Sequence, residues 1–327
     1  MRGVTVVICF IIFSLSVVGQ PLEETISVKP NPGEGIWSFL RRHDLAPQEH
    51  LERFRLLNEG KFAPDGGLYV HHHYIIPIVS TRWVEPLFGK DHQDLRLLDE
   101  ELKGAVFYLV SGHGGPDPGA IGKYGDHLLY EDEYAYDITL RLAKNLMQKG
   151  AKVHVIVQDP HNGIRSGAIL TPDENERVMG QVIPLDQIQR LKQRSDAINN
   201  LFRQENSDYQ RCIEIHLDSR SRTHQLDVFF YYHQHSRSGK QMAETLRKTF
   251  EENYRRHQPN RGFSGTVTHR NLYMLRNTRP VAVFVELGNI MNFRDQQRFV
   301  VESNRQALAN WLTAGIVEDY KNHQNNK

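Results

Sequence analysis

Two histidines and two glutamates have the types and positions that could do chemistry in this chain. His113 lies in a loop rich in glycine and proline that follows an apolar run over residues 105–110. Glu131 begins a helical pattern, and His216 and Glu286 each end a run of strand-like residues. Open α/β sheets carry their chemistry at the carboxyl ends of their strands, so we expect these four side chains to form one site.

The expected chemistry is that of a hydrolytic zinc site, which takes three protein ligands and leaves a fourth position for water. His113, Glu131 and His216 would supply the ligands. Two imidazoles with one carboxylate suit Zn²⁺, although the sequence does not separate it from other divalent ions. Zinc lowers the pKa of a water ligand from ~15.7 toward ~7. Glu286 would act as general base toward that water and then as general acid to the leaving amine, which predicts metal-assisted amide hydrolysis.

Two nearby glutamates have to be weighed against this set. Glu133 could replace Glu131, but two residues along a helix turn a side chain by ~200°, away from the site. Glu214 points to the same side of its strand as His216. It could orient a metal ligand or simply face a neighbouring helix, and the sequence leaves both interpretations open.

The loop around His113 is ambiguous when it is considered alone. Glycines precede and follow the histidine and permit backbone angles that are closed to other residues. This pattern fits a ligand loop and a glycine-rich turn with an incidental histidine equally well. Asp117 and Asp218 are interpreted as turn residues that shape loops rather than as ligands.

The elements that must position these residues alternate between strand and helix from about residue 104 onward. Strand signals fall at residues 105–110, 152–157, 211–216, 226–232, 271–275 and 281–286, and helix signals fall at 131–149, 185–204, 240–257 and 295–322. This alternation predicts an α/β fold with a largely parallel, mixed sheet and helices on both faces. Right-handed crossovers then bring successive strand ends to one edge.

Four segments resemble the signatures of zinc-dependent N-acetylmuramoyl-L-alanine amidases of the cell-separation type. They are HGGPDPGA at 113–120, LYE at 129–131, IEIHLD at 213–218 and VFVELGNIMN at 283–292, and the resemblance extends over residues 104 to about 318. It implies that His113, Glu131 and His216 hold zinc and that Glu286 is the catalytic glutamate. It also implies cleavage of the amide between N-acetylmuramic acid and L-alanine in peptidoglycan.

The chain departs from that family in two places. Glu214 stands where the family usually has serine, two residues before the histidine. The segment between residues 157 and 185 is also longer than the short turn of compact relatives, and long loops in compact domains tend to be functional or mobile. In some relatives an inserted segment covers the zinc site until an activator displaces it. We therefore expect residues 160–184 to border or cover the cleft, with a protein activator as a possible partner.

The start of the chain predicts export. A basic residue, an apolar run from Val4 to Val18 and a small residue at Gly19 are typical of a secretory signal peptide over residues 1–19. The chain has 40 Lys and Arg against 39 Asp and Glu, and cleavage would remove Arg2, which leaves no net charge to favour nucleic acid or a membrane surface. We expect no membrane span after cleavage, and a periplasmic or wall-associated location. Cys212 would then be alone, and we interpret it as a packed strand residue.

Residues 26–78 predict a small α+β unit before a linker over residues 79–103 and the catalytic domain over 104–322. This unit resembles a LysM module, which implies binding to N-acetylglucosamine polymers, although Glu34 and Gly35 stand where the pattern has Asp and its neighbour. Its predicted closing strand carries His71, His72 and His73. Adjacent strand residues alternate faces, so we interpret these histidines as an exposed strand end rather than a metal site.

Two function classes follow from these patterns. The favoured one is an exported zinc amidase that acts on peptidoglycan in wall remodelling or daughter-cell separation, with its N-terminal module on the glycan. The alternative is a catalytically silent wall-binding or regulatory protein of the same fold, and the presence of all four chemical residues argues against it. A zinc peptidase that cuts the stem peptide would share the site but not the set of motifs.

Overall fold

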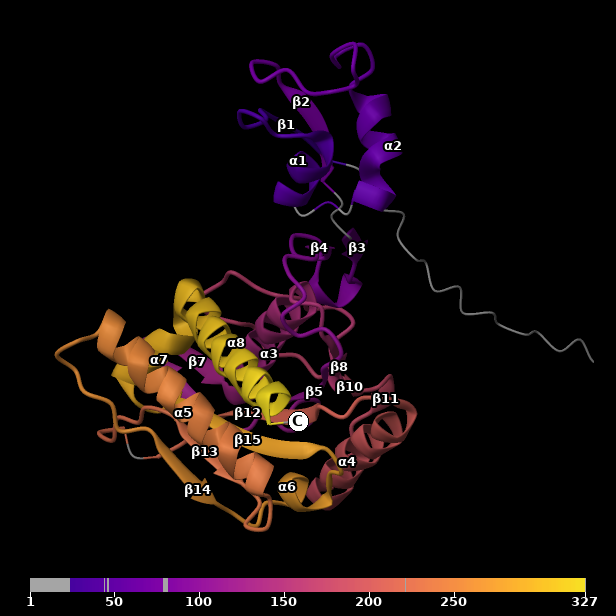
Figure 1. Cartoon of the computed structure of the whole chain (residues 1–327). Helices are drawn as coiled ribbons and strands as arrows, with labels where there is room; N and C mark the ends of the chain where they lie inside the picture. Colours follow the sequence, from indigo (N-terminus) through magenta and orange to yellow (C-terminus); the bar gives the residue numbers. More distant parts are fainter. Residues whose placement is uncertain (1–23, 44, 46, 79–81, 221, 327) are drawn as a thin grey trace, which may run out of the picture. The chain divides into compact units, whose positions relative to one another are not determined.

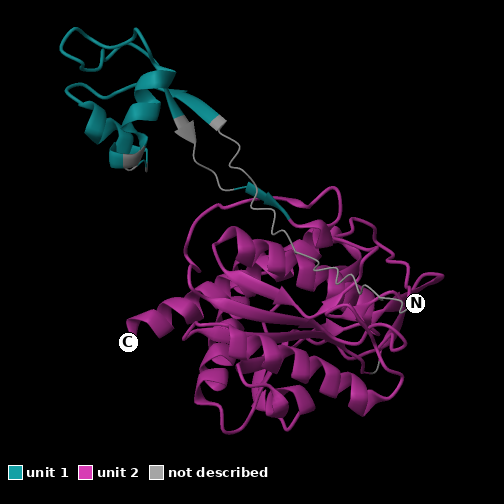
Figure 2. Cartoon of the chain, turned by 90° about the vertical axis from the view of Figure 1, so that its right-hand side faces the viewer, with its two compact units in different colours: residues 1–84 teal, residues 85–327 magenta. Residues whose placement is uncertain are grey.

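The computed structural model describes residues 24–43, 45, 47–78, 82–220 and 222–326. The chain divides into two compact units, residues 1–84 and residues 85–327 (Figure 2). The predicted signal peptide lies outside the described residues. Within the described ranges, none of the helices combines the length and the apolar character needed to cross a membrane.

The first unit is a small α+β arrangement. β1 (Glu24–Val28) pairs antiparallel with β2 (Tyr74–Ile78), and α1 (Ile36–Arg42) and α2 (Pro47–Leu57) lie between them in sequence. Its core contains the buried rings of Phe39, Phe54 and Tyr74. The buried amide of Asn58 donates to the carbonyl of Phe54 and accepts from the amide of Ile75, at 2.7 Å, so the end of α2 is tied to β2.

The closing strand of this unit is shorter than the prediction. It begins at Tyr74, after the three histidines that the prediction placed within it. Residues 67–73 are irregular because the chain turns at Gly66, whose φ is +81°, and the Tyr69 amide donates to the Tyr74 hydroxyl. The three consecutive histidines at positions 71–73 lie in this turn region and are exposed.

The segment predicted as a linker contains regular elements. β3 (Arg82–Val84) is the last element of the first unit. The 3₁₀ helix η1 (Pro86–Phe88) and β4 (Asp94–Arg96) belong to the second unit. Phe88, Leu95 and Leu102 are buried, so residues 85–103 contribute apolar side chains to the second unit.

A six-stranded sheet with the order β14-β13-β15-β12-β5-β8 forms the centre of the second unit. The strands are β5 (Val106–Ser111), β8 (Lys152–Val155), β12 (Gln210–Asp218), β13 (Phe229–Tyr232), β14 (Thr266–His269) and β15 (Val281–Asn289). Neighbouring strands are parallel except at the β13–β15 junction, which is antiparallel. The predicted fold class, a largely parallel mixed sheet, is confirmed.

Helices cover both faces of this sheet (Figure 1). α3 (Glu131–Gln148), α5 (Arg237–His257) and α8 (Glu302–Asn325) pack on one face and on one another. α4 (Gln187–Gln204) and α6 (Tyr273–Asn277) cover the other face. Alternate strand residues, among them Tyr108 and Cys212, join α4 in one core cluster, so the even-numbered positions of β5 and β12 face α4.

Several predicted elements of this unit differ in the structure. The strand predicted at 152–157 ends at Val155, and β14 was not predicted. Residues 271–275, predicted as a strand, include the start of the short helix α6, because a five-residue apolar pattern does not separate a strand from one helical turn. The long helix predicted at 295–322 is divided into α7 (Phe293–Val300) and α8 by Val301, whose backbone is extended. β13 begins at Phe229 rather than at residue 226.

Five short strands form two small antiparallel sheets in the second unit. β6 (Ile121–Tyr124) and β7 (His127–Tyr130) form an antiparallel hairpin between the His113 loop and α3. β9 (Val157–Gln158), β10 (Arg177–Val178) and β11 (Gln181–Val182) form a small antiparallel sheet. The long segment after β8 is therefore partly ordered as a hairpin.

Candidate metal centre

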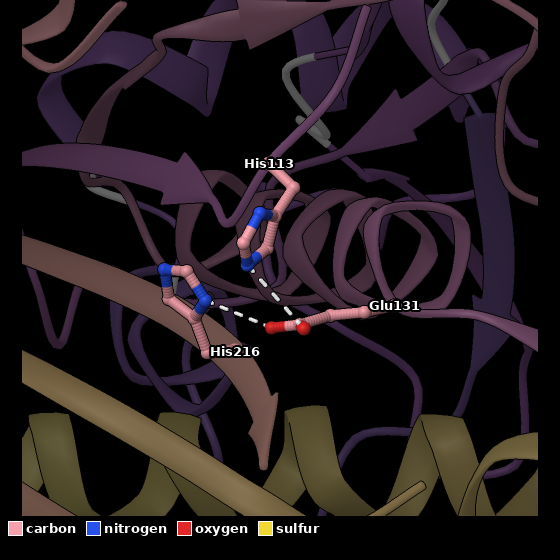
Figure 3. Close-up of side chains that lie close together, drawn as sticks. All are labelled: His113, Glu131 and His216. Carbon is pink, nitrogen blue, oxygen red and sulfur yellow. Dashed lines mark hydrogen bonds and ion pairs between the residues drawn. The ribbon is translucent and has the colours of Figure 1, made fainter. Parts of the chain in front are cut away.

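Three side chains predicted as ligands converge at the carboxyl edge of the sheet. Nε2 of His113 lies 3.3 Å from Oε2 of Glu131, and Nδ1 of His216 lies 2.8 Å from Oε1 of the same carboxylate. One donor atom from each of the three residues lies within 4.8 Å of the other two. Figure 3 shows both imidazoles directed toward the carboxylate between them. This is the spacing of atoms that can share one metal ion.

Strand register brings the two histidines together from positions far apart in the sequence. β5 and β12 are parallel neighbours, with Ser111 opposite Ile215, so His113, which follows β5, and His216, which lies near the end of β12, meet at the same edge of the sheet. Their rings are 4.9 Å apart and nearly perpendicular. His113 has a φ of 60°, a left-handed conformation that is uncommon outside glycine and turns the side chain toward the strand edge.

Two glycines leave the room that these ligands need. A Cβ at Gly112 would lie 2.4 Å from the His216 ring, and a Cβ at Gly119 would lie 2.6 Å from the His113 ring and 2.8 Å from the Glu131 carboxylate. Gly119 also has a φ of +68°, which favours glycine. The glycine content of this loop is therefore a steric requirement of the cluster, in addition to its effect on backbone freedom.

Glu131 is held by the backbone on both sides of the site. It is the first residue of α3, and its carboxylate accepts the amide protons of Ala120 at 2.8 Å and Leu217 at 3.0 Å. The competing residue Glu133 is directed elsewhere and forms an ion pair with Arg165 at 2.7 Å. Of these two glutamates, only Glu131 lies with the histidines.

Each histidine has a second carboxylate beside its other ring nitrogen. Nδ1 of His113 lies 3.0 Å from Oδ2 of Asp117, which also forms an ion pair with Arg190 at 2.8 Å. Nε2 of His216 lies 3.4 Å from Oε1 of Glu214. Carboxylates in such positions orient metal-binding histidines. The interpretation of Asp117 as a turn residue missed this contact, and its spacing of four residues from His113 was the available signal.

The charges of the cluster respond to this arrangement. Burial lowers the pKa of both histidines, but contacts with carboxylates outweigh it. Hydrogen bonds to Asp117 and Glu131 raise the pKa of His113 to about 9, and contacts with Glu131 and Glu214 raise the pKa of His216 to about 10. The same histidines hold the pKa of the buried Glu131 carboxyl well below its usual range. A proton on each ring therefore compensates the carboxylates, and a divalent cation can replace that positive charge.

Glu286 stands beside this cluster on the next strand. It is the register partner of His216 in the parallel β12–β15 pair, so the two side chains leave the sheet on the same face. Its Oε2 atom is buried and has no hydrogen-bond partner among the described residues. Burial raises its pKa to about 8. A divalent cation nearby would oppose this rise, because a positive charge favours the ionised carboxylate.

A cavity of about 190 Å³ opens on the α4 side of the ligands. Its walls include His113, His216 and Glu214 from the cluster, together with Tyr273 of α6 and Phe284 of β15. The lining combines charged and polar side chains with aromatic and aliphatic ones. Such a cavity can hold a chain with both amide and apolar groups.

The long segment at 160–184 borders the His113 loop but is absent from the walls of this cavity. The Glu176 carboxylate accepts the amide proton of Gly115 at 2.9 Å, and a Cβ at Gly115 would lie 3.0 Å from the Ile183 side chain. The segment therefore supports the ligand loop from outside the cavity. Sequence patterns did not single out Glu176, which has no motif of its own.

A second group of acidic residues lies under this segment. Asp132, Glu133 and Glu176 are buried, and their carboxylate oxygens lie within 4.8 Å of one another. Burial, together with repulsion from the neighbouring carboxylates, raises the pKa of Asp132 to about 8 and that of Glu176 to about 7. We therefore expect the stability of this part of the unit to depend on pH.

Known proteins resemble this chain over the second unit. Residues 108–318 match the family model Amidase_3, described as N-acetylmuramoyl-L-alanine amidase. A germination-specific N-acetylmuramoyl-L-alanine amidase of Bacillus subtilis (strain 168) is 24% identical over 220 residues, which are 66% of this chain and 80% of that protein. The family match contains His113, Glu131, His216 and Glu286.

Solved structures of amidases also resemble the chain. The CwlD amidase from Clostridioides difficile, in complex with the GerS lipoprotein, is 18% identical, with 66% of this chain and 98% of that chain covered and a TM-score of 0.49. AmiC2 of Nostoc punctiforme is 19% identical, with 67% and 98% covered and a TM-score of 0.47. The catalytic domain of CwlV from Bacillus (Paenibacillus) polymyxa var. colistinus is 22% identical, with 65% and 97% covered and a TM-score of 0.47.

Proposed function

The chain belongs to the Amidase_3 family of N-acetylmuramoyl-L-alanine amidases, enzymes of peptidoglycan, and from this membership we propose that it is an exported, zinc-dependent hydrolase. Its substrate is the amide bond between N-acetylmuramic acid and the L-alanine of the stem peptide. Its role is cell-wall remodelling or daughter-cell separation. The observation that carries the proposal is the convergence of His113, Glu131 and His216 within 4.8 Å inside the family match.

The donor set fits a zinc ion. Nε2 of His113, Nδ1 of His216 and a carboxylate oxygen of Glu131 would hold it, and three such ligands leave a position open for water or substrate. When bound, the ion supplies a Lewis acid that polarises the scissile carbonyl and lowers the pKa of water. The buried backbone contacts of Glu131 and the carboxylates beside both rings keep these donors in place.

Glu286 is the proposed catalytic residue. Its carboxylate takes a proton from the attacking water and delivers it to the nitrogen of L-alanine as the C–N bond breaks. The products are a free lactyl carboxylate on the muramic acid and a stem peptide with a free amino group. Its place opposite His216 in the sheet and its unpaired Oε2 atom support this role.

The first unit is proposed to hold the enzyme on the glycan. It has the strand, helix, helix, strand order that a LysM module requires, with β1 and β2 paired. Trp37 and Tyr69 are 46% and 41% exposed, which leaves aromatic surface for a sugar ring. A variant that lacks residues 1–84 is expected to bind insoluble peptidoglycan less well and to keep its cleavage of soluble muropeptides.

One experiment separates the proposed activity from its alternatives. Purified protein and its Glu286→Gln variant are incubated with peptidoglycan and zinc, and the products are identified by mass spectrometry. We expect intact stem peptides with a free L-alanine amino group from the wild type, and a rate at least ~100-fold lower from the variant. Internally cut peptides would indicate a peptidase. An absence of products from the wild type would support the silent binding protein.

A further inference from the structure

Glu214 has no role in the proposed reaction, yet it lies directly beside a proposed metal ligand. It is two residues before His216 on β12, so both side chains leave the same face of the strand. Glu214 is buried, and its Oε1 atom is 3.4 Å from Nε2 of His216. Oε2 of Glu214 and Nε2 of His216 are buried atoms without a hydrogen-bond partner among the described residues. The buried Nε2 nitrogen of His216 thus has no hydrogen-bond partner in the described part of the chain, and the Glu214 carboxylate lies beside it, with Oε1 at 3.4 Å.

The tautomer of His216 decides what this pair does. The ring presents Nδ1 to Glu131 at 2.8 Å, on the side where the three donor atoms converge. A neutral imidazole that binds a metal through Nδ1 must carry its proton on Nε2. That N–H is a buried donor, and a buried donor that is left without an acceptor destabilises the structure. Glu214 supplies the acceptor within reach.

The surroundings keep both partners in this orientation. Phe284 stacks on the His216 ring with centroids 4.3 Å apart and an angle of 16° between the planes, so the ring cannot easily turn. Arg194 is buried nearby, and the Glu214 carboxylate opposes the fall in its pKa that burial causes. Arg194 in turn donates to the carbonyl of His113. Glu214 is therefore buried beside a cation, Arg194, and beside the ring nitrogen that would carry the proton of a His216 bound to metal through Nδ1.

We propose that Glu214 is a positioning residue that accepts the Nε2 proton of His216 and thereby fixes the tautomer that binds the metal through Nδ1. Glu214 contacts Nε2 of His216, just as Asp117 contacts Nδ1 of His113, so each carboxylate lies at the ring nitrogen that faces away from the Glu131 carboxylate. This inference rests on the proposed metal site and deepens it. Serine at this position, which the resembling family usually has, is shorter and carries no charge, so Glu214 gives this chain a stronger acceptor at the ring.

Zinc affinity tests the proposal. The full chain is compared with Glu214→Gln and Glu214→Met by competition with a chromophoric chelator. Loss of such an acceptor typically weakens metal binding 10–100-fold, so we expect about that loss for the Met variant. We expect a smaller loss for the Gln variant, because its amide oxygen accepts the same hydrogen bond. The matched control is Glu205→Gln, which alters a carboxylate 2.8 Å from Nε2 of His154 at another place in the unit and should leave the affinity unchanged.

A measurement on the wild type protects the test against a variant that does not fold. In ¹⁵N-labelled protein loaded with zinc, the NMR signals of His216 should show a proton on Nε2 and the metal on Nδ1. Coordination through Nε2 would overturn the proposal, as would a Met variant that binds zinc as tightly as the Glu205→Gln control. A wild type that binds no zinc would refute the metal site and this inference together. Normal peptidoglycan cleavage with unchanged affinity in the Met variant would refute only the role of Glu214.

Discussion

Replacing Gly112 by alanine tests the steric design of the proposed metal centre without changing any of its candidate ligands. The added Cβ would lie 2.4 Å from both Nδ1 and Cε1 of the His216 ring, whereas real Cβ contacts stay above 3.0 Å. The ring must therefore move by roughly 1 Å to reach ordinary van der Waals contact, near 3.4 Å. Zinc sites tolerate deviations of only about 0.2 Å in ligand distance.

This displacement is expected to lower the cleavage rate strongly and the free energy of unfolding only slightly. A misplacement of ~1 Å in a catalytic group costs ~100-fold in rate, so peptidoglycan cleavage by Gly112→Ala should fall by about two orders of magnitude. Overpacking costs ~1–3 kcal/mol, which leaves the unit folded. The release of stem peptides is measured at saturating zinc, beside zinc affinity and urea unfolding.

Gly167→Ala is the matched control for this variant. A Cβ at Gly167 would meet its nearest atom, the carbonyl oxygen of Ile169, at 3.4 Å, an ordinary contact away from the metal centre. This control should retain wild-type cleavage and affinity. If Gly112→Ala also binds zinc and cleaves peptidoglycan as the wild type does, then the Gly112–His216 contact does not constrain the site and the reasoning is wrong.

Three further outcomes follow from the charges of the second unit. Dialysis against a chelator should abolish cleavage, and added zinc should restore it. The circular dichroism spectrum should stay unchanged, because the three donor side chains pair with one another without the metal. Cleavage that survives dialysis would contradict a metal requirement. Burial raises the pKa of Glu176 from 4.5 to about 7, so the stability that its proton contributes is complete below pH 4.5 and is lost as the pH rises toward 7. Glu176→Gln should therefore gain up to about 3 kcal/mol relative to the wild type between pH 4.5 and 7 in urea unfolding, and parallel pH curves would refute this. Asp137→Ala removes the carboxylate that pairs with the buried Arg141 at 2.8 Å and the buried Arg305 at 2.7 Å, and it should lower the free energy of unfolding by ~3–5 kcal/mol. Glu302→Ala removes a half-exposed partner of Arg141 and should lower it by less than ~1 kcal/mol. Equal losses in the two variants would contradict the argument.

The sequence alone predicted the fold class and the residues that could do chemistry. Apolar runs such as residues 105–110, each followed by a polar residue or a glycine-rich loop, indicate buried strands and mark their carboxyl ends. Parallel topology then requires those ends to meet at one edge, which is why His113 and His216 could be grouped before their geometry was known. These inferences need only local periodicity, side-chain type and chain direction.

Local patterns did not predict the elements whose form depends on packing. Residues 271–275 have apolar residues that fit a strand or a helical turn, and burial of Met274 and Leu275 accompanies the helix. Val301 carries no breaking signal, yet its extended backbone divides α7 from α8. In both cases contacts with other elements outweigh intrinsic preference, because the free-energy difference between backbone forms over a few residues is small.

Tertiary structure alone decided how the candidate ligands are supported. Asp117 has a turn-like sequence context, but it lies 3.0 Å from Nδ1 of His113. Glu214 had two open interpretations, and the structure sets it 3.4 Å from Nε2 of His216. The spacing of residues in sequence can suggest such a contact, but strand register and side-chain rotamers decide whether it forms. The sequence determined which side chains could bind a metal, and the fold decided which ring nitrogen of each histidine faces the Glu131 carboxylate.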